Sequence, residues 1–427
     1  MSSLRLGALA TVVAVVLSGC DGGGGPAPEA APLEVMGVWS GVEEERFRLV
    51  LDEFERRSGA RVTYTSAGRG GVAGALAARR AEGRAPDVAF LPQPGLLRSL
   101  AADGALVELG GPALMTVEAN HGDVWRRLSS VDGRLYGVPF KAANKSLLWY
   151  DVAAFQRAGV VPPATLAGLG RVAAGFASQG LPAFAVAGAD GWTLTDWFEN
   201  LYLRTAGAER YDLLAEHRLA WTDPSVLEAL GLLVDLLRPE LVAGGADGAL
   251  ATGFDESIEV AFGAPGGAAM VMEGDFVASV VAARTGAEVG VDVDAFPFPP
   301  RDGTGRGVVG GGDIAVLMRP SAVGAALMEY LATPAAAVPW ASRGGFISPN
   351  LNLDLSVYPD ELTRRLARAV LDAGDLFRFD LSDLTPAAFG GTERQGMRGI
   401  LQDLLVTRDV PAAAAALEAA ARDAYGR

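Results

Sequence analysis

The chain has 427 residues, half of them apolar and a fifth charged, so it is long enough for two or three domains and too apolar to be disordered. Its formal net charge of −15 argues against nucleic acid as a partner, since phosphate binding needs a basic surface. Lys141 and Lys145 are the only lysines, against 34 arginines among the 36 basic residues, a bias that we attribute to nucleotide composition.

The N-terminus has the pattern of a secretory leader. An apolar run over 6–17 is shorter than the roughly 20 residues that a helix needs to span a bilayer. The run ends in Leu17-Ser18-Gly19-Cys20, which resembles the lipobox of bacterial lipoproteins, where the leader is removed before a cysteine that then carries a lipid. No other cysteine occurs, which excludes an internal disulfide and a cysteine-based zinc site. We expect a signal peptide over 1–19, lipidation at Cys20 and a flexible tether over 20–32.

The first part of the folded body alternates between strand and helix patterns. Strands are expected over 33–38, 61–65 and 87–91, and helices over 71–82 and 96–102. Another helix should follow the first strand, with Ser40 and Glu43 forming a capping box. This alternation predicts a parallel doubly wound sheet, whose strand exits near Trp39, Ser66 and Gln93 should open on one edge.

The rest of the chain continues the alternation and ends in helices. An Asp-Gly pair at 132–133 predicts a hairpin turn. Strands are expected over 146–151, 182–186 and 314–318, and helices over 172–178, from Thr195, from Asp223, and over 321–331, 334–341, 360–372, 393–406 and 410–425. We see no repeat of fixed period.

The stretch from Met270 to Ser279 predicts a strand, a tight turn and a helix. Two carboxylates, Glu273 and Asp275, flank Gly274 in the turn. Ligands of open α/β sheets bind outside the carboxyl ends of strands, and glycine lets the backbone come close to them. Asp275 could cap the helix, whereas Glu273 has no local role and could point into the crevice. The alternative is that both carboxylates are solvated turn residues.

Short motifs occur in a fixed order along the chain: Trp39-Ser40-Gly41, Gly137-Val138-Pro139, Trp149-Tyr150-Asp151, Met270-x-x-x-Gly274 and Gly344-Gly345-Phe346. In this order they resemble the extracellular solute-binding proteins of ABC sugar importers, of the maltodextrin-binding class. The C-terminal third is similar to the α-glucoside-binding subgroup, through Tyr330-Leu331-Ala332-Thr333-Pro334, Phe377-Arg378-Phe379-Asp380-Leu381-Ser382-Asp383 and Pro386-Ala387-Ala388-Phe389-Gly390-Gly391. The resemblance spans 33–427 and rests on the order of the motifs.

The resemblance implies an α/β, two-lobed fold of the periplasmic-binding-protein type, with a mainly parallel sheet in each lobe and extra C-terminal helices. The first lobe would comprise 33–138 and 308–338, and the second 146–300 and 345–427. Hinge crossovers would lie at 139–145, 299–307 and 337–345, with the ligand between the lobes.

The family's ligand positions map onto Trp39, Ser40, Glu43, Gln93, Lys141, Asn144, Trp192, Glu273, Asp275, Phe276, Gly312, Asp313 and Arg343. Such a set suits a sugar, because carboxylates, amides and guanidinium groups bind hydroxyls and flat rings stack on sugar faces. One departure is Pro92-Gln93-Pro94, where the maltodextrin class often carries an aromatic and a charge, so the sugar and its length stay open. The remaining tryptophans, Trp125, Trp149, Trp197, Trp221 and Trp340, are expected to pack in the core.

The sequence therefore predicts a lipid-anchored, extracytoplasmic, monomeric binding protein that captures a sugar by lobe closure and delivers it to a permease, without catalysis, cofactor or metal. His121 and His217 are the only histidines, and the chain has neither a phosphate-loop ending after Gly310-Gly311-Gly312 nor a Gly-x-Ser-x-Gly motif. Two alternatives stay open. One is a glycoside hydrolase using Glu273 with Asp275 or Asp313, and the other is a binding protein for a polyamine or another small solute.

Overall fold

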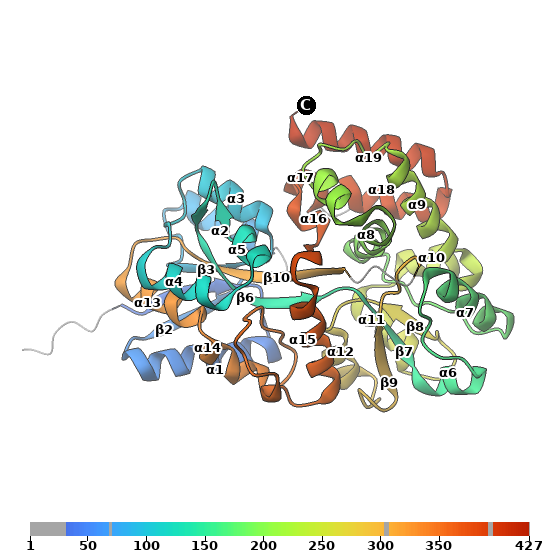
Figure 1. Cartoon of the computed structure of the whole chain (residues 1–427), viewed down its shortest axis with the longest axis horizontal. Coiled ribbons are helices and arrows are strands. Elements are labelled where there is room, and N and C mark those ends of the chain that lie inside the picture. The colour runs from blue at the N-terminus through green and yellow to red at the C-terminus, as the bar shows by residue number, and fades with distance from the viewer. Residues whose placement is uncertain (1–30, 68–70, 303–306, 392–395, 427) are drawn as a thin grey trace, which may run out of the picture.

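The computed structural model describes residues 31–67, 71–302, 307–391 and 396–426. The predicted signal peptide, Cys20 and most of the tether lie outside these ranges. The described chain forms two α/β lobes side by side, with strands that run from one into the other (Figure 1). None of the described helices combines the length and apolar character needed to cross a bilayer.

The first lobe is built on a twisted sheet of parallel strands with antiparallel additions. Its strands β2 (Val62–Ser66), β1 (Leu33–Gly37) and β3 (Val88–Leu91) are parallel neighbours, as predicted. Beside β3, β10 (Val308–Leu317) runs antiparallel. β10 also pairs antiparallel with β6 (Gly137–Asn144) and parallel with β11 (Phe377–Phe379). The predicted turn at 132–133 joins β4 (Ser130–Val131) to β5 (Arg134–Leu135).

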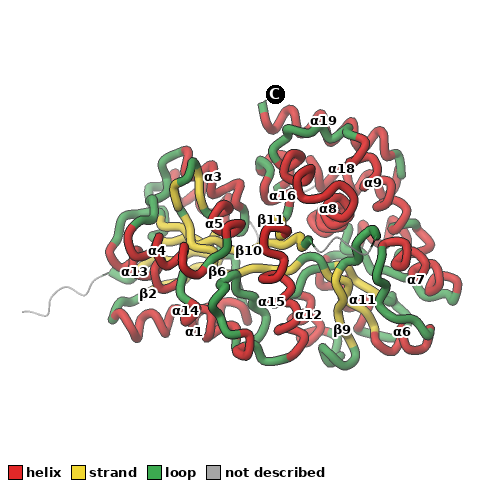
Figure 2. The backbone as a smooth tube through the Cα atoms, viewed as in Figure 1, coloured by secondary structure: helices red, strands yellow, loops and turns green. Residues whose placement is uncertain are grey.

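Helices cover both faces of this sheet (Figure 2). They are α1 (Val42–Ser58), α2 (Gly71–Ala81), α3 (Pro94–Ala102), α4 (Gly111–Asn120), α5 (Asp123–Leu128), α13 (Ala322–Leu331) and α14 (Pro334–Ala341). The predicted capping box of α1 is wrong, because Gly41 takes the N-cap position with φ 56° and no side chain caps the helix. Ser40 is left one residue outside the first turn and exposed.

The second lobe has a smaller sheet of three strands in the order β8 (Met270–Met272), β7 (Leu147–Asp151), β9 (Val293–Pro297). The two-lobed α/β fold is confirmed, but these strands pair antiparallel and not mainly in parallel. β7 enters the lobe directly from β6 and lies between β8 and β9, and both of these strands run opposite to it. The expected strand over 182–186 is reduced to bridges from Phe184 to Val242 and Met270, which are parallel.

Helices enclose this second sheet and form a separate layer at the C-terminus. The helices are α6 (Val152–Ala158), α7 (Leu166–Ser178), α8 (Trp192–Ala215), α9 (Pro224–Leu236), α10 (Gly245–Ala251), α11 (Phe254–Phe262), α12 (Val277–Arg284), α15 (Glu361–Ala373), α16 (Leu381–Leu384), α17 (Ala387–Gly390), α18 (Gly396–Thr407) and α19 (Val410–Tyr425). α8 starts at Trp192, so Thr195 is not its cap as predicted; its hydroxyl donates to the Trp192 carbonyl. The five tryptophans expected in the core are all buried.

The two lobes are joined by β6, which continues into β7, and by β10, which pairs antiparallel with β6 (Figure 1). The strands approach closely at Gly312, where a Cβ would overlap the Lys141 carbonyl oxygen and lie 3.1 Å from Trp125. Glycine is therefore required at this crossing. The lobe boundaries given above remain a prediction; β11 pairs with β10, and α15 contacts β6 and β10.

Candidate functional site

Most predicted site residues gather where the two lobes meet, around two buried lysines. The Lys141 cluster consists of Lys141, Glu43, Asp275 and Asp313, and the Lys145 cluster of Lys145, Asp196, Glu273, Asp380 and Asp383. Each ammonium lies over an indole ring, Lys141 5.1 Å from the centroid of Trp340 and Lys145 5.2 Å from that of Trp192. The only two lysines of the chain thus stand at the crossover between the lobes.

In the Lys141 cluster, the ammonium is held by carboxylates of the first lobe. Lys141 Nζ donates to Glu43 Oε1 at 2.6 Å, and Asp313 lies opposite Lys141 in the ladder of β6 and β10, beside a bulge. Burial opposes the charge of Lys141, but Glu43 and Asp313 raise its pKa above the usual value. Burial raises the pKa of Asp313 to about 6, against the attraction of Lys141. The cluster is therefore a coupled set of buried charges.

Asp275 fastens the crossover and does not cap α12 as predicted. Phe276 takes the N-cap position of α12, which no side chain caps. Asp275 Oδ1 accepts from the backbone N–H of Asn144 at 2.6 Å, and the Asp275 N–H donates to the Asn144 carbonyl at 3.0 Å. The side chain of Asn144 in turn accepts from the Ser146 N–H. Burial raises the pKa of Asp275 to about 6, an effect that the Asn144 N–H and Lys141 oppose.

The structure places Trp39 in the aromatic core and not on an open surface. Its side chain is 1% exposed, and its ring packs against Phe47, Phe90 and Trp340 at centroid distances of 4.6, 4.8 and 5.0 Å. The indole lowers the pKa of Asp313, although no hydrogen bond of normal geometry joins the two side chains. Enclosed rings of this kind stabilise the fold and leave no free face for a sugar.

The Lys145 cluster was not predicted as a unit. Lys145 Nζ donates to Asp196 Oδ1 at 3.1 Å and to Asp380 Oδ2 at 2.5 Å. Asp196 lies on α8, and Asp380 caps α16. The Lys145 charge overcomes burial and holds the pKa of Asp380 well below its usual value, whereas burial raises the pKa of Asp196. One ammonium thus serves two carboxylates that are almost completely buried.

Glu273, Asp196 and Asp313 each have one buried carboxylate oxygen without a hydrogen-bond partner among the described residues. Glu273 follows β8 directly, is 2% exposed, and the unpartnered oxygen is its Oε2 atom. Burial raises its pKa to about 8, against the attraction of Lys145. A buried oxygen without a donor destabilises a protein unless a ligand or water supplies the hydrogen. A hydrogen bond with the adjacent Gly274 backbone also opposes the rise in the pKa of Glu273, so this residue has one local contact, and its role in a crevice remains a prediction.

Three partly exposed rings form an aromatic platform beside the Lys145 cluster. Trp192 lies 5.4 Å from Phe254 and 6.1 Å from Phe276, and the two phenylalanines lie 5.4 Å apart. The rings stand at the starts of α8, α11 and α12. Gly274 makes room for one of them, because a Cβ there would overlap the Phe276 ring. A platform of this kind can stack on the apolar face of a sugar ring.

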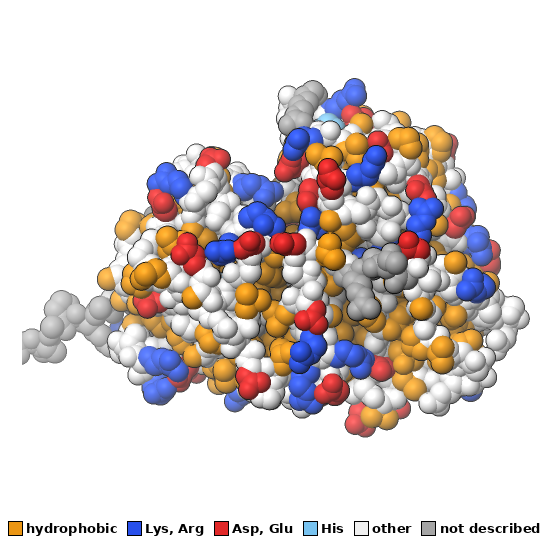
Figure 3. Space-filling view, viewed as in Figure 1, with side chains coloured by type: hydrophobic (Ala, Val, Ile, Leu, Met, Phe, Trp, Pro, Cys, Tyr) orange, Lys and Arg blue, Asp and Glu red, His pale blue; other side chains and the backbone are white. Residues whose placement is uncertain are grey.

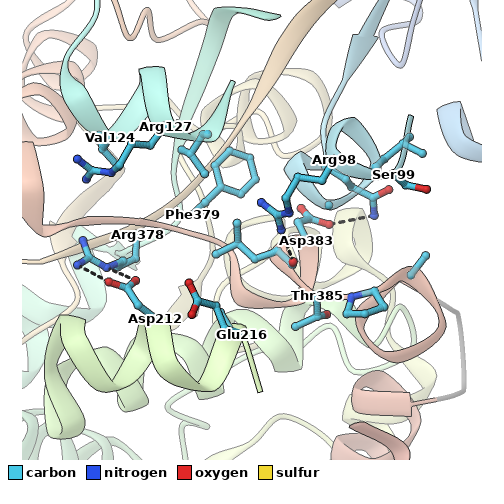
Figure 4. A pocket seen from close by; sticks show the side chains of 18 of the residues that line it. Arg98, Ser99, Val124, Arg127, Asp212, Glu216, Arg378, Phe379, Asp383 and Thr385 are labelled. Atoms are coloured by element: carbon cyan, nitrogen blue, oxygen red, sulfur yellow. Dashed lines mark hydrogen bonds and ion pairs between the residues drawn. The ribbon is translucent and has the colours of Figure 1, made fainter. Parts of the chain in front are cut away.

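Gln93 connects the lobes at the edge of a cavity of about 830 Å³. Its Nε2 donates to Asp383 Oδ1 at 3.1 Å, and Arg98 Nη2 donates to the Leu384 carbonyl at 2.6 Å, so α3 is tied to α16. Figure 3 shows a notch between the first lobe and the C-terminal helices, with basic side chains on its walls. Figure 4 shows Arg98 on one side of this cavity and the ion pair of Arg378 with Asp212 on the other.

Not every predicted residue joins the clusters. Of the predicted set, Gln93 alone lines the large cavity, and Trp192 lines a separate open hollow of about 600 Å³. Arg343 is exposed and donates to the carbonyl of Pro339 in its own helix, 2.7 Å away. Its guanidinium is therefore engaged locally and contacts neither cluster.

Sequence reasoning missed Lys145, Asp196, Asp380 and Phe254. One signal could have found the first of them, since both lysines of a nearly lysine-free chain fall four residues apart at a predicted crossover. Asp196, Asp380 and Phe254 carry no such signal. They come from α8, the end of β11 and the start of α11, and only the fold brings them to the same place.

Comparison with known proteins gives a consistent result. A family model described as bacterial extracellular solute-binding protein matches residues 40–338. The osmoprotective compounds-binding protein GgtB of Synechocystis sp. is 34% identical over 90% of this chain and 92% of its own. The alpha-glucosides-binding periplasmic protein AglE of Rhizobium meliloti is 32% identical over 84% of this chain and 80% of its own. A solved structure of the bacterial solute receptor AcbH, 19% identical, superimposes with a TM-score of 0.80 over 92% of this chain and 98% of its own.

Proposed function

Because the chain belongs to the bacterial extracellular solute-binding proteins, we propose that it captures a sugar between its two lobes and delivers it to the permease of an ABC importer. Members of this family bind solutes and are not enzymes, so the assignment overturns the glycoside hydrolase alternative. The acids around Glu273 then serve to bind hydroxyl groups and not to cleave a glycosidic bond.

The proposed solute is an α-glucoside or a related oligosaccharide. Support comes from the Rhizobium meliloti relative, whose name states that it binds alpha-glucosides and which covers most of this chain. The aromatic platform and the nearby carboxylates offer the combination that sugars require, flat rings for apolar faces and acceptors for hydroxyls. The similarity to the osmoprotective compounds-binding protein extends the search to osmoprotective compounds.

The observation that carries the proposal is the open acceptor beside the platform. Glu273 Oε2 is buried and unpartnered among the described residues, and Phe276 of the platform follows it by three positions. Lys145 touches the same platform through the Trp192 ring. These contacts support the proposal, because a sugar needs an acceptor and a donor for its hydroxyls and a flat surface for its ring.

Capture by closure of the lobes is the proposed mechanism. In this conformation α3 of the first lobe contacts α16 through Gln93 and Arg98. A ligand that touches both lobes stabilises the closed form because it binds that form better than the open one. The interlobe bonds are few, so the equilibrium can respond to the binding energy of a small solute.

The placement in the cell is a further part of the proposal. The family is extracellular, which puts the folded body outside the cytoplasm. We propose that the leader over 1–19 is removed, that Cys20 carries a lipid, and that the protein acts as a monomer on the membrane surface. Replacement of Cys20 by alanine should release the protein from the membrane fraction, and retention there would contradict the anchor.

A thermal-shift panel tests the proposed function directly. The folded protein is heated with maltose, trehalose, sucrose, raffinose and, as a control for the alternative solute class, spermidine. A ligand that binds the native state alone raises the melting temperature. We expect a rise with at least one α-glucoside, a saturable calorimetric isotherm and no hydrolysis product. A rise with spermidine and with none of the sugars would overturn the proposal.

A further inference from the structure

The Lys145 ammonium has a donor to spare. Two of its three N–H bonds point to Asp196 and Asp380, and the ammonium lies over the ring of Trp192. No further hydrogen bond of this group is seen within the described ranges. Its side chain is 12% exposed, so a small group could reach it from the platform side.

Glu273 has an oxygen that could accept a hydrogen bond and does not receive one from the described residues. This atom, Oε2, is buried. The pairing of β7 with β8 brings Glu273 beside the start of β7, where its N–H donates to the Leu147 carbonyl at 3.2 Å, two residues after Lys145. No ion pair within 4.0 Å joins the two side chains in the described structure. The two groups are therefore neighbours that do not touch, one with an unused hydrogen and one with an unused lone pair.

On the premise of the proposed function, we propose that Lys145 and Glu273 together bind one hydroxyl group of the ligand. The hydroxyl oxygen accepts a hydrogen bond from Lys145 Nζ, and its hydrogen is donated to Glu273 Oε2. The sugar ring that carries this hydroxyl stacks on Trp192. Lys145, which is absent from the family-derived set of ligand positions, is then a specificity-determining residue of the site.

The pair selects for a group that accepts and donates at once. A hydroxyl satisfies both partners, because it carries lone pairs and one hydrogen. A polyamine offers hydrogens to Glu273 but is repelled by Lys145, and an ether or a carboxylate offers lone pairs to Lys145 but none of the hydrogen that Glu273 needs. An unsatisfied buried group is a strong means of rejection, so the pair should exclude both classes.

The test uses Glu273→Met with Glu361→Met as a control of the same residue change. Glu361 is 79% exposed, pairs with Arg364 on α15 and lies outside both the Lys145 cluster and the hollow beside Trp192. Removing an unpartnered buried carboxylate should raise the melting temperature of the free protein. The same variant should weaken binding of the α-glucoside found by the thermal-shift panel about 10- to 100-fold, as expected when a ligand hydroxyl loses its buried hydrogen-bond partner. The control should bind like the natural protein.

Derivatives of that sugar identify the hydroxyl. At one position, replacement of the hydroxyl by hydrogen and its O-methylation should both weaken binding to the natural protein. In Glu273→Met the O-methyl derivative at that position should bind as well as the parent sugar. Unchanged affinity of Glu273→Met, or a loss of stability together with binding, would overturn the inference while leaving the proposed function intact. Failure of every α-glucoside to bind the natural protein would instead overturn the proposed function.

Lysine labelling gives an independent readout that a purely structural role would not change. Because the chain has two lysines, ¹³C at the ε position gives two side-chain signals. The Lys145 signal, assigned by its loss in Lys145→Arg, should shift with the parent sugar and shift less with the singly deoxygenated derivative. Equal shifts with both sugars would contradict a direct contact.

Discussion

The two lysine clusters use the same kind of residues for different purposes. In the Lys141 cluster, Glu43 is half exposed and bonded to the ammonium, and Asp275 is joined to the backbone of Asn144 in both directions. In the Lys145 cluster, the ammonium is shared by Asp196 and Asp380, and Glu273 is left with an oxygen that no described group serves. Among the described residues, each cluster keeps a buried carboxylate oxygen without a partner, Asp313 Oδ1 in the first and Glu273 Oε2 in the second. What distinguishes the second cluster is the aromatic platform beside it, which Lys145 contacts through the Trp192 ring.

On the proposed function, the hinge predicted at 139–145 and the proposed site at Lys145 lie in the same short stretch of chain. On the Lys141 side, two hydrogen bonds join Asp275 to the Asn144 backbone, one from the Asp275 N–H and one to its carboxylate. On the Lys145 side the carboxylates are held by α8, α16 and the turn after β8, which belong to separate elements. A cluster whose residues come from several elements can leave one hydrogen-bonding group without a partner in the free protein. A bound ligand can then supply that partner.

The largest expected effect is a difference in unfolding free energy between variants of the two lysines. Lys145→Met leaves Asp196 and Asp380 buried without a cation and should destabilise the protein by about 3–5 kcal/mol. Lys141→Met should cost less, because its bonded partner Glu43 is 42% exposed and can be solvated. Urea unfolding of both variants measures the difference. The double variant Lys145→Met/Asp380→Asn should recover part of the lost stability. If Lys141→Met lost as much stability as Lys145→Met, the two clusters would be energetically equivalent.

The second prediction concerns pH. Burial raises the pKa of Glu273 to about 8, against Lys145 and with repulsion from Asp190 and Asp380, while the unfolded carboxyl has its ordinary value near 4.5. Between these values the folded state binds more protons than the unfolded state, so stability falls as the pH rises, by up to about 1.4 kcal/mol per pH unit for this group. Glu273→Gln should show a shallower decline than the natural protein between pH 5 and 8. A parallel decline in both proteins would mean that Glu273 does not titrate in this range.

The third prediction concerns the platform. In Gly274→Ala the new methyl group overlaps the Phe276 ring, which can turn away at small cost because it is the end of a side chain. Stability should change by less than about 1 kcal/mol, whereas the affinity for the α-glucoside should fall about 3- to 10-fold, as expected for one lost ring contact. Calorimetry and urea unfolding separate the two effects. Phe276→Ala is the reference, and a normal affinity in both variants would remove Phe276 from the site.

The sequence predicted those parts of the fold and site that local patterns determine. The strands and helices of the first lobe follow from alternation of apolar residues and from the turn at 132–133, and the open role of Glu273 follows from its position after a strand. Lys141, Glu43, Asp275 and Asp313 were assigned as ligand positions from the family resemblance, and the structure brings them together; their contact with a ligand remains a prediction. Asp275 was expected to cap α12, but the N-cap position falls one residue later, at Phe276.

The parts that could not be predicted depend on long-range contacts. Trp39 follows a strand like a typical ligand-binding aromatic, but rings from α1, β3 and α14 enclose it. Asp196 and Asp380 look like helix-start residues in the sequence, and 184 positions of chain separate them. Their meeting at Lys145 follows from the packing of α16 against α8, which no local pattern encodes. The strand direction in the second lobe was missed for the same reason.

The smallest expected effect tests whether the lobes are held together at the edge of the Lys145 cluster. Gln93→Ala removes the bond to Asp383, which joins α3 to α16, and a hydrogen bond of this kind contributes about 0.5–1.5 kcal/mol. Because opening of the lobes would break this bond in the natural protein, its loss should shift the unliganded protein toward the open form. The radius of gyration without ligand should rise and the affinity should fall about 2- to 10-fold. With saturating ligand the radius should return to the natural value.

Ser99→Ala is the matched control for this change. Ser99 lies on the same helix and lines the same cavity, but its side chain makes no hydrogen bond across the lobes within the described residues. A larger radius in Gln93→Ala alone would identify the bond to Asp383 as a restraint on opening. The same radius in both variants would mean that the Lys141 side, with its backbone bonds between Asp275 and Asn144, sets the angle between the lobes without help from the Lys145 side.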